Sequence, residues 1–227
     1  MLNLQKILII RFSSLGDLVL TTPIYREIKR VYPDARISVL TSNDVGLVLE
    51  NNKHIDNLVI HKRKENFLEL NRLIKKLRKE RFDLIYDAHR SLRSMWIVLN
   101  LSRCWFSKNP EIWSIKKRSF LKSLLVSFKF NFLKESPAQR IHLLRPLQEH
   151  TNLNLNNHTE LFPENKTTLF IKKFLNKNGL FSKKFIAIGA SASYSLKCWP
   201  VSHFYELISG LLKKGWPLVL VGGKNEI

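Results

Sequence analysis

The sequence predicts an α/β protein with a parallel, doubly wound sheet, followed by a second α/β region with fewer elements. Short runs of β-branched and aromatic residues alternate with amphipathic stretches at intervals of about 25 to 30 residues, which is typical of successive βαβ crossovers. The runs lack strict polar alternation, as expected of strands buried on both faces. The chain has 227 residues, 44% of them hydrophobic, enough for one large or two small domains.

The first expected strand, KILIIRF at residues 6–12, precedes a polar turn and a helix. In that helix Thr22 is expected as the cap, Pro23 as the first helical residue and Pro33 as the stop. The elements expected next are a strand at 35–41, a short helix at 44–51, a strand at 57–61, a helix at 65–82 and a strand at 82–88. The last of these helices carries its leucines on one side and its basic residues on the other, so it should bury one face.

Residues 105–135 interrupt this alternation. Besides Trp105 they contain six Phe or Trp and seven Lys or Arg, but only two acidic residues. The composition predicts an interface segment, with aromatic rings in a lipid headgroup region and basic side chains against anionic lipid. A core-packed connection is the alternative. The residues concerned are Trp113, Phe120, Phe128, Phe130 and Phe132, with Lys116, Lys117, Arg118 and Lys122.

The expected domains are an N-terminal domain at 1–150, a linker and first helix at 151–180, and a partial C-terminal domain at 181–227. The last domain has two strand-like runs, 185–191 and 217–223, around a helix at 201–214. Two strands cannot cover their own apolar faces or pair both of their edges. We therefore expect an incomplete second domain: either the protein continues beyond Ile227, or a truncated chain pairs with another polypeptide or stays loosely folded.

The net charge and the cysteine content indicate which kind of partner and which cell compartment to expect. The chain has 38 Lys and Arg against 18 Asp and Glu, a net charge of +20, so a phosphate-rich partner is expected. Cys104 and Cys198 cannot build a disulfide framework and have no metal-ligand spacing, which indicates a reducing, cytosolic environment. No stretch has the roughly 20 apolar residues of a spanning helix, and the N-terminus lacks a signal-peptide pattern. Any membrane contact is expected to be peripheral.

The turn RFSSLGD follows the first strand, where open α/β sheets bind ligands. Ser13, Ser14 and Gly16 can present N–H groups to an anion or polar ligand, and Asp17 places a carboxylate at the mouth of the cleft. The single glycine matches neither a dinucleotide fingerprint nor a P-loop. The alternative is that Asp17 only complements the helix N-terminus.

A second polar loop, IGASASYSLKCWP, precedes the helix that starts after Pro200. Ser191, Ser193 and Ser195 offer hydroxyl groups and Lys197 a positive charge, at the helix end that attracts phosphate. A phosphate pocket is one interpretation, and an ordinary serine-rich loop with a solvated lysine is the other.

Arginines follow two of the expected strands, Arg63 after the third and both Arg90 and Arg93 after the fourth. They should lie at the ligand-binding edge of the sheet, where the planar guanidinium suits bidentate anion binding. A solvated charge run is the alternative. The seven histidines show no pairing at helical ligand spacing, and there is no DxD carboxylate pair, so no metal site is expected.

Three segments, in this order, resemble glycosyltransferase family 9, the ADP-heptose:lipopolysaccharide heptosyltransferases. They are KILIIRFSSLGDLVLTTPIYREIKRVYPDARISVLT, FDLIYDAHRSLRS and GASASYSLKCWPVSHFYELISGLLKKGWPLVLVGGKNE. The resemblance implies a GT-B architecture, two Rossmann-like domains with the acceptor on the first and the nucleotide-sugar donor on the second. It implies that Asp17 is the catalytic base, that Lys197 contacts the donor phosphates and that Ser191 matches the hydroxyl residue of the preceding loop, with a looser match at Ser193. Family members continue past the VGG strand, so most of the donor site would lie outside these residues.

The implied function is an inverting, metal-independent glycosyltransferase that moves heptose from an ADP-sugar to the lipopolysaccharide inner core, with no cofactor besides the donor substrate. The implied partners are the nucleotide-sugar, a lipid A core acceptor, an anionic membrane surface and a second chain that supplies the missing C-terminal half. The implied location is cytoplasmic and peripheral, at the inner face of the bacterial inner membrane. Two alternatives stay open. One is an inactive remnant that binds anionic lipid or lipopolysaccharide core, and the other is nucleic-acid binding, which the charge suggests but no specific recognition motif supports.

Overall fold

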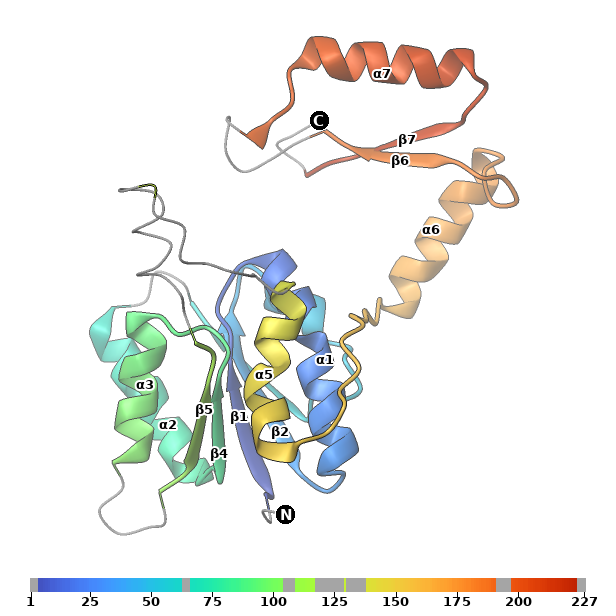
Figure 1. The fold of residues 1–227 in the computed structure, drawn as a ribbon. Coiled ribbons are helices and arrows are strands. Elements are labelled where there is room, and N and C mark those ends of the chain that lie inside the picture. Colours follow the sequence, from blue (N-terminus) through green and yellow to red (C-terminus); the bar gives the residue numbers. More distant parts are fainter. Residues whose placement is uncertain are drawn as a thin grey trace. The chain divides into compact units, whose positions relative to one another are not determined.

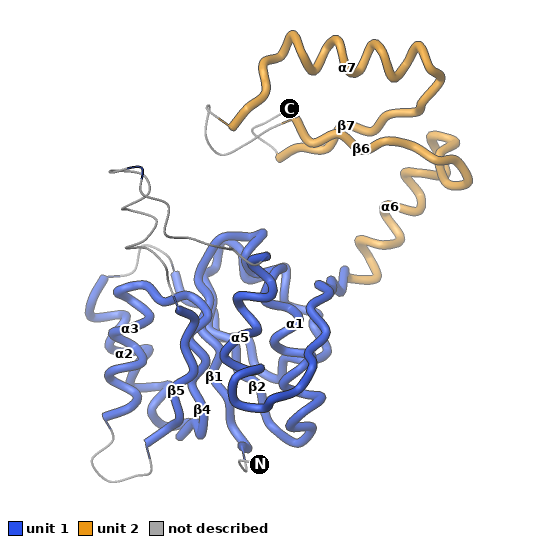
Figure 2. Tube along the Cα trace, viewed as in Figure 1, with its two compact units in different colours: residues 1–163 blue, residues 164–227 orange. Residues whose placement is uncertain are grey.

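The computed structural model describes residues 4–62, 66–103, 109–116, 129, 138–190 and 197–223. The chain forms two compact units, residues 1–163 and residues 164–227 (Figure 2). The division falls later than the expected end of the N-terminal domain at residue 150. Within the described residues, no helix is both long and apolar enough to span a bilayer.

The first unit is built on a five-stranded parallel sheet with the order β3-β2-β1-β4-β5 (Figure 1). The strands are β1 (Lys6–Ile10), β2 (Arg36–Ser42), β3 (Asn57–His61), β4 (Leu84–Asp87) and β5 (Glu111–Ser114). The central strand β1 places Ile7 opposite Ile37 of β2 and Leu84 of β4. Its residues from Ile7 to Ile10 are fully buried, as the uninterrupted apolar run predicts.

Helices cover both faces of this sheet. They are α1 (Leu15–Val31), α2 (Phe67–Glu80), α3 (Leu92–Ser102) and α5 (Gln139–Thr151), with a short 3₁₀ helix η1 (Gly46–Leu49) where the sequence predicts a helix at 44–51. α1 and α5 pack on the face that carries Ile7 and Ile9, whereas α2 and α3 pack on the face of Leu8 and Ile10 (Figure 1). Successive side chains of β1 thus enter two separate cores, the arrangement of a doubly wound sheet.

α1 begins earlier than the sequence predicts. Ser14 is its N-cap, and the predicted start at Thr22 and Pro23 lies in its interior. Pro23 has no N–H to donate to the carbonyl of Val19, four residues before it. The Thr22 hydroxyl donates to that carbonyl at 2.8 Å, so the helix continues through the proline. The first turn of α1 therefore follows β1 directly and carries Asp17 to the carboxyl end of that strand.

The sequence pattern does not predict α3 or β5. β5 pairs with β4 in parallel, with Trp113 opposite Tyr86. The Trp113 side chain is buried and its ring stacks on His150 of α5 at a centroid distance of 4.3 Å. The placement of Trp113 in a lipid headgroup region is therefore wrong, because this ring belongs to the core. Phe120, Phe128, Phe130, Phe132, Lys117, Arg118 and Lys122 lie outside the described residues.

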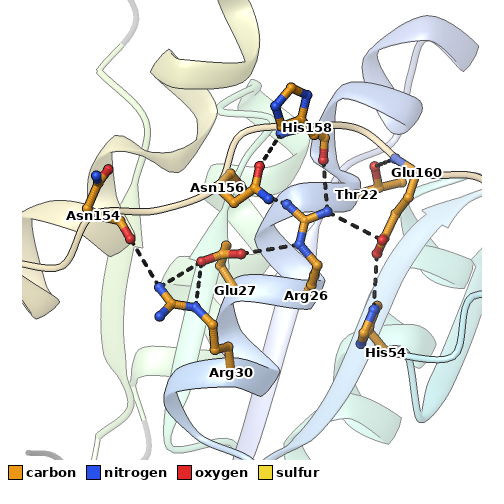
Figure 3. A network of polar contacts seen from close by, with 9 residues as sticks. All are labelled: Thr22, Arg26, Glu27, Arg30, His54, Asn154, Asn156, His158 and Glu160. Atoms are coloured by element: carbon orange, nitrogen blue, oxygen red, sulfur yellow. Dashed lines mark hydrogen bonds and ion pairs between the residues drawn. The ribbon is translucent and has the colours of Figure 1, made fainter.

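The segment 152–163, expected as part of a linker, is held against α1 by polar contacts (Figure 3). Arg26 donates to the backbone carbonyls of Asn156 at 2.8 Å and His158 at 2.9 Å. The backbone N–H of Glu160 donates to the Thr22 hydroxyl at 3.0 Å. These contacts explain why the first unit extends to residue 163.

The second unit contains α6 (Asn165–Lys177), β6 (Ile186–Gly189), α7 (Val201–Lys213) and β7 (Leu218–Val221). β6 and β7 pair in parallel as a two-stranded sheet. Among its described residues, Ile188 is the only buried hydrophobic side chain, and α6 and α7 have none. Large apolar side chains such as Phe170, Val201 and Leu220 are instead exposed. This unit alone does not form a packed core within the residues described.

Candidate functional site

The carboxyl edge of the first sheet brings together several side chains that can bind a ligand or accept a proton. From β1 the chain continues through β2 and β3 on one side, whereas β4 and β5 lie on the other side of β1 (Figure 1). Such a reversal of strand order opens a crevice outside the strand ends, where open α/β sheets bind ligands. The loops after β1 and β4, residues 11–14 and 88–91, both lead to this edge.

Asp17 lies in the first turn of α1, next to the loop after β1. Its Oδ2 accepts hydrogen bonds from the backbone N–H and the hydroxyl of Ser14, both at 3.2 Å, and lies 2.6 Å from Nη2 of Arg11. The Asp17 side chain is 33% exposed, and within the described residues no group donates to its Oδ1. Asp17 therefore caps the helix through one oxygen and leaves the other available to a ligand.

The electrostatic surroundings keep Asp17 ionised. Burial by itself would raise the pKa of this carboxyl group. The hydrogen bond from the Ser14 N–H and the positive charge of Arg11 outweigh burial, so the pKa of Asp17 is lowered from its usual value. At neutral pH the group is a carboxylate, the form that can accept a proton from a substrate.

A hollow of about 450 Å³ opens beside Ser13. Its lining comes from the ends of β1 and β2, the loop after β4 and the start of α3, and consists of Phe12, Ser13, Ser42, His89, Ser91, Leu92 and Arg93. The Arg93 guanidinium lies 5.9 Å from the centre of the Phe12 ring, and its Nη1 lies 3.5 Å from Nε2 of the buried His61. The Phe12 ring also meets His89 edge-on at 5.3 Å. Hydroxyl groups, a guanidinium and an aromatic wall suit a hydroxylated, anionic ligand.

Asp87 fixes the loop after β4. Its buried carboxylate accepts the backbone N–H groups of His89 at 3.0 Å and Arg90 at 2.7 Å, and the Ser94 hydroxyl at 3.0 Å. Arg90 adopts φ 52° in this turn. Its side chain lines a neighbouring, mainly apolar hollow rather than the one beside Ser13. The turn therefore separates two arginines that the sequence predicts together, because Arg93 alone lines the hollow beside Ser13.

The structure brings part of the predicted site together. Ser13, Ser14, Gly16, Asp17 and Arg93 all lie at the edge described above, and a Cβ on Gly16 would meet no described atom within 4 Å. Lys197 is exposed in the second unit, just before α7. Arg63, Ser191 and Ser193 lie outside the described residues. Within the described residues, no group of three or more His, Cys, Asp or Glu could hold a metal ion.

Sequence reasoning missed Arg11, Phe12 and Ser42 as site residues. Each follows or ends a strand at the carboxyl edge, so strand boundaries alone could have pointed to them. What those boundaries do not give is which of these side chains turn towards Asp17, since that depends on the loop between β1 and α1.

The pattern of glycosyltransferase family 9 (heptosyltransferase) matches residues 70–227, more than half of the chain. The chain belongs to glycosyltransferase family 9. A curated relative, lipopolysaccharide heptosyltransferase 3 from Escherichia coli, is 26% identical over 226 residues, which is 93% of this chain and 62% of the relative. This family 9 chain thus spans about three fifths of the length of the curated relatives it matches.

Solved structures of the same family share the fold. A family 9 glycosyltransferase from Veillonella parvula DSM 2008 matches with a TM-score of 0.78 at 16% identity, over 100% of this chain and 65% of that one. The E. coli heptosyltransferase WaaC with ADP-2-deoxy-2-fluoro heptose matches with a TM-score of 0.65 at 18% identity, over 98% of this chain and 70% of that one. The expected fold class, α/β of the GT-B type, is confirmed for this family 9 chain.

Proposed function

We propose that this chain serves an inverting, metal-independent transfer of heptose from an ADP-sugar to the lipopolysaccharide inner core. The observation that carries the proposal is Asp17: an ionised carboxylate at the crevice of the first sheet, with Oδ2 fixed and Oδ1 without a donor among the described residues. Membership in glycosyltransferase family 9, and relatives named as lipopolysaccharide heptosyltransferases, support the substrate class.

In the proposed reaction, Asp17 Oδ1 takes the proton of an acceptor hydroxyl. The hydroxyl oxygen forms a bond to the anomeric carbon of the heptose while the bond from that carbon to the diphosphate breaks on the opposite face. The configuration at the carbon is therefore inverted, and ADP leaves. A general base of this kind contributes about 10²- to 10⁴-fold to the rate.

Charge that develops on the leaving diphosphate needs positive partners. Lys197, four residues before the start of α7, is proposed to meet it together with the hydroxyl groups of Ser191 and Ser193 and the N-terminus of that helix. This arrangement uses side chains and helix N–H groups in place of a metal ion. The ADP-sugar is the donor substrate, and no separate cofactor enters the proposal.

The acceptor is proposed to occupy the hollow beside Ser13, with Arg93 and the N–H of Gly16 as anion-binding groups, since the N–H and hydroxyl of Ser14 already bind Asp17. Arg63 and Arg90 are proposed to meet further phosphate or carboxylate groups of the same acceptor. The net charge of +20 favours an acidic saccharide on an anionic membrane surface. The proposed location is the cytoplasm, peripheral to the inner face of the bacterial inner membrane.

A second candidate is a remnant without catalysis that binds lipopolysaccharide core or anionic lipid through the first unit. It is favoured by the exposed apolar side chains of the second unit, which has no packed core within the described residues. For a transferring enzyme, the proposal includes a second polypeptide that packs on these side chains and completes the donor side. Calorimetry with ADP and an ADP-sugar separates the candidates, with Lys197→Ala as control: acceptor binding without ADP binding supports the remnant.

The test of catalysis is sugar transfer by Asp17→Asn. Asparagine keeps the shape of the side chain but cannot take up the proton, so the rate should fall by about 10²- to 10⁴-fold. Asp34→Asn is the matched control, an exposed aspartate just beyond the other end of α1, and it should leave transfer unchanged. Full activity in Asp17→Asn would refute the assigned base.

A further inference from the structure

We propose that Arg11 is a positioning residue for the catalytic carboxylate: it binds Asp17 through Oδ2 and so presents Oδ1 to the acceptor hydroxyl. The inference rests on the proposed function, in which Asp17 is the base. It concerns a residue that the sequence shows only as the end of an apolar strand run.

Arg11 is fixed at the point where three segments meet. Its Nε donates to the Ser13 carbonyl at 2.9 Å, its Nη1 donates to the Ala88 carbonyl at 2.6 Å, and its Nη2 pairs with Asp17 at 2.6 Å. One planar group therefore joins the loop after β1, the loop after β4 and the first turn of α1. The Arg11 side chain is only 7% exposed, so burial as well as hydrogen bonding restricts it.

The two carboxylate oxygens of Asp17 have different surroundings. The polar contacts that described residues make with this carboxylate, two from Ser14 and one from Arg11, fall on Oδ2. A carboxylate held by one oxygen at three points has little freedom to rotate, and Oδ1 then keeps a constant direction. The proton of the acceptor hydroxyl is transferred to Oδ1, and the Arg11 guanidinium keeps its own protons throughout.

Arginine suits this place better than lysine. A guanidinium has five N–H donors in a fixed fork and can serve two carbonyls and a carboxylate at once. A lysine ammonium at position 11 would keep the charge but could not reach three acceptors that lie around the plane of the fork. Charge and orientation can therefore be tested separately in one position.

Other charged groups near this edge are few among the described residues. Arg11 is the one charged side chain there that acts on the pKa of Asp17. His89, from the loop after β4, and Arg93, from the first turn of α3, line the hollow beside Ser13. The positive charge of Arg11 also acts on the buried Tyr25 of α1, but burial raises the pKa of that phenol above its usual value, so it stays neutral.

A role in loop structure alone is the competing explanation, because Arg11 also ties two backbone carbonyls. That role predicts a loss of stability when Arg11 is replaced, with the titration of Asp17 unchanged. Positioning predicts a change at Asp17 itself. The deciding readout is therefore the carboxyl pKa of Asp17, which can be measured whether or not the chain catalyses transfer.

The experiment is a ¹³C NMR titration of carboxyl groups in the 227-residue chain, with the Asp17 signal assigned by its loss in Asp17→Asn. In Arg11→Gln the Asp17 pKa should shift upward, and in Arg11→Lys it should stay closer to the unsubstituted value. Arg36→Gln, at the opposite edge of the same sheet, is the matched control and should leave it unchanged. Equal Asp17 titration in Arg11→Gln and the unsubstituted chain would overturn the proposal.

The transfer reaction supplies a second readout. In both Arg11 variants kcat should fall by roughly 10- to 100-fold with little change in KM, since a misplacement of about 1 Å costs up to about 100-fold. Only Arg11→Gln should move the acidic limb of the pH profile to higher pH. If Arg11→Gln does not fold, Arg11→Lys decides: unchanged kcat overturns the proposal. If Asp17→Asn retains transfer, the proposed base fails, while the NMR titration still decides whether Arg11 governs the carboxylate.

Discussion

Replacement of Arg26 by methionine should release the segment that leads from the first unit to the second. Arg26 donates to the carbonyls of Asn156 and His158 at 2.8 and 2.9 Å, and lies 3.3 Å from the carboxylate of Glu160 (Figure 3). It also lies 3.2 Å from the buried Glu27 of its own helix. Methionine keeps the aliphatic packing of the arginine stem but removes every donor.

The magnitude follows from the exposure of these contacts. The Arg26 side chain is 20% exposed, so each of the two carbonyl bonds should contribute about 1 kcal/mol rather than the upper value for charged donors. The partly exposed pair with Glu160 adds less than about 1 kcal/mol. Opening of the segment should therefore become easier by about 2 to 3 kcal/mol, a factor of roughly 30 to 150 in the equilibrium.

Amide hydrogen exchange at Glu160 measures this opening, because its N–H donates to the Thr22 hydroxyl at 3.0 Å. Protection there should fall about 30- to 150-fold in Arg26→Met if exchange follows local opening. Arg30→Met is the matched control one turn later. Arg30 is 51% exposed and donates to a single backbone carbonyl of this segment, that of Asn154, so protection should fall less than about fivefold. Equal protection at Glu160 in Arg26→Met and the unsubstituted chain would refute the reasoning.

Two further predictions concern the first unit. Burial alone would raise the pKa of Asp56, but the hydrogen bonds from Lys29 and the Ile37 N–H, together with the Lys29 charge, lower it on balance. The stability that Asp56 contributes is therefore present above its unfolded-state pKa and is lost as the pH falls through its folded-state pKa. In Asp56→Asn the free energy of unfolding, measured by denaturant, should fall less steeply with decreasing acidic pH, and an unchanged pH dependence would contradict this. Tyr86→Phe removes the buried hydroxyl that donates to the Leu143 carbonyl, so urea unfolding should show a loss of about 0.5 to 1.5 kcal/mol, and a loss near zero would argue against the bond.

The candidate site could be predicted in part from the sequence. The position of Asp17 could be predicted, because a polar SSLGD turn after a buried strand lies at the carboxyl edge of a parallel sheet. Its ion pair with Arg11 could not be predicted, since strand boundaries place Arg11 at this edge without showing whether its side chain turns to Asp17 or to solvent. The pairing depends on α1 starting at Leu15, which brings its first turn back over the end of β1.

Some predicted residues separate once the chain folds. Arg90 and Arg93 are three residues apart in the sequence, but the turn held by Asp87 directs them to different hollows. Trp113 illustrates the opposite error: a composition rich in aromatic and basic residues suggested a lipid interface, whereas its ring packs in the core. Composition describes a segment as a whole and cannot tell which of its side chains faces inward.

The sequence by itself determined the alternation of buried strands and amphipathic helices, the parallel sheet that this alternation requires and the edge at which a ligand would bind. These features follow from local hydrophobic pattern and from the right-handed crossover, both of which act over short stretches of chain. Only the tertiary structure decided that α1 continues through Pro23, that β5 joins the sheet and that Arg11 forms an ion pair with Asp17. Each depends on a contact between segments distant in the sequence or on a hydrogen bond that replaces a missing donor, and neither leaves a periodic signal in the chain.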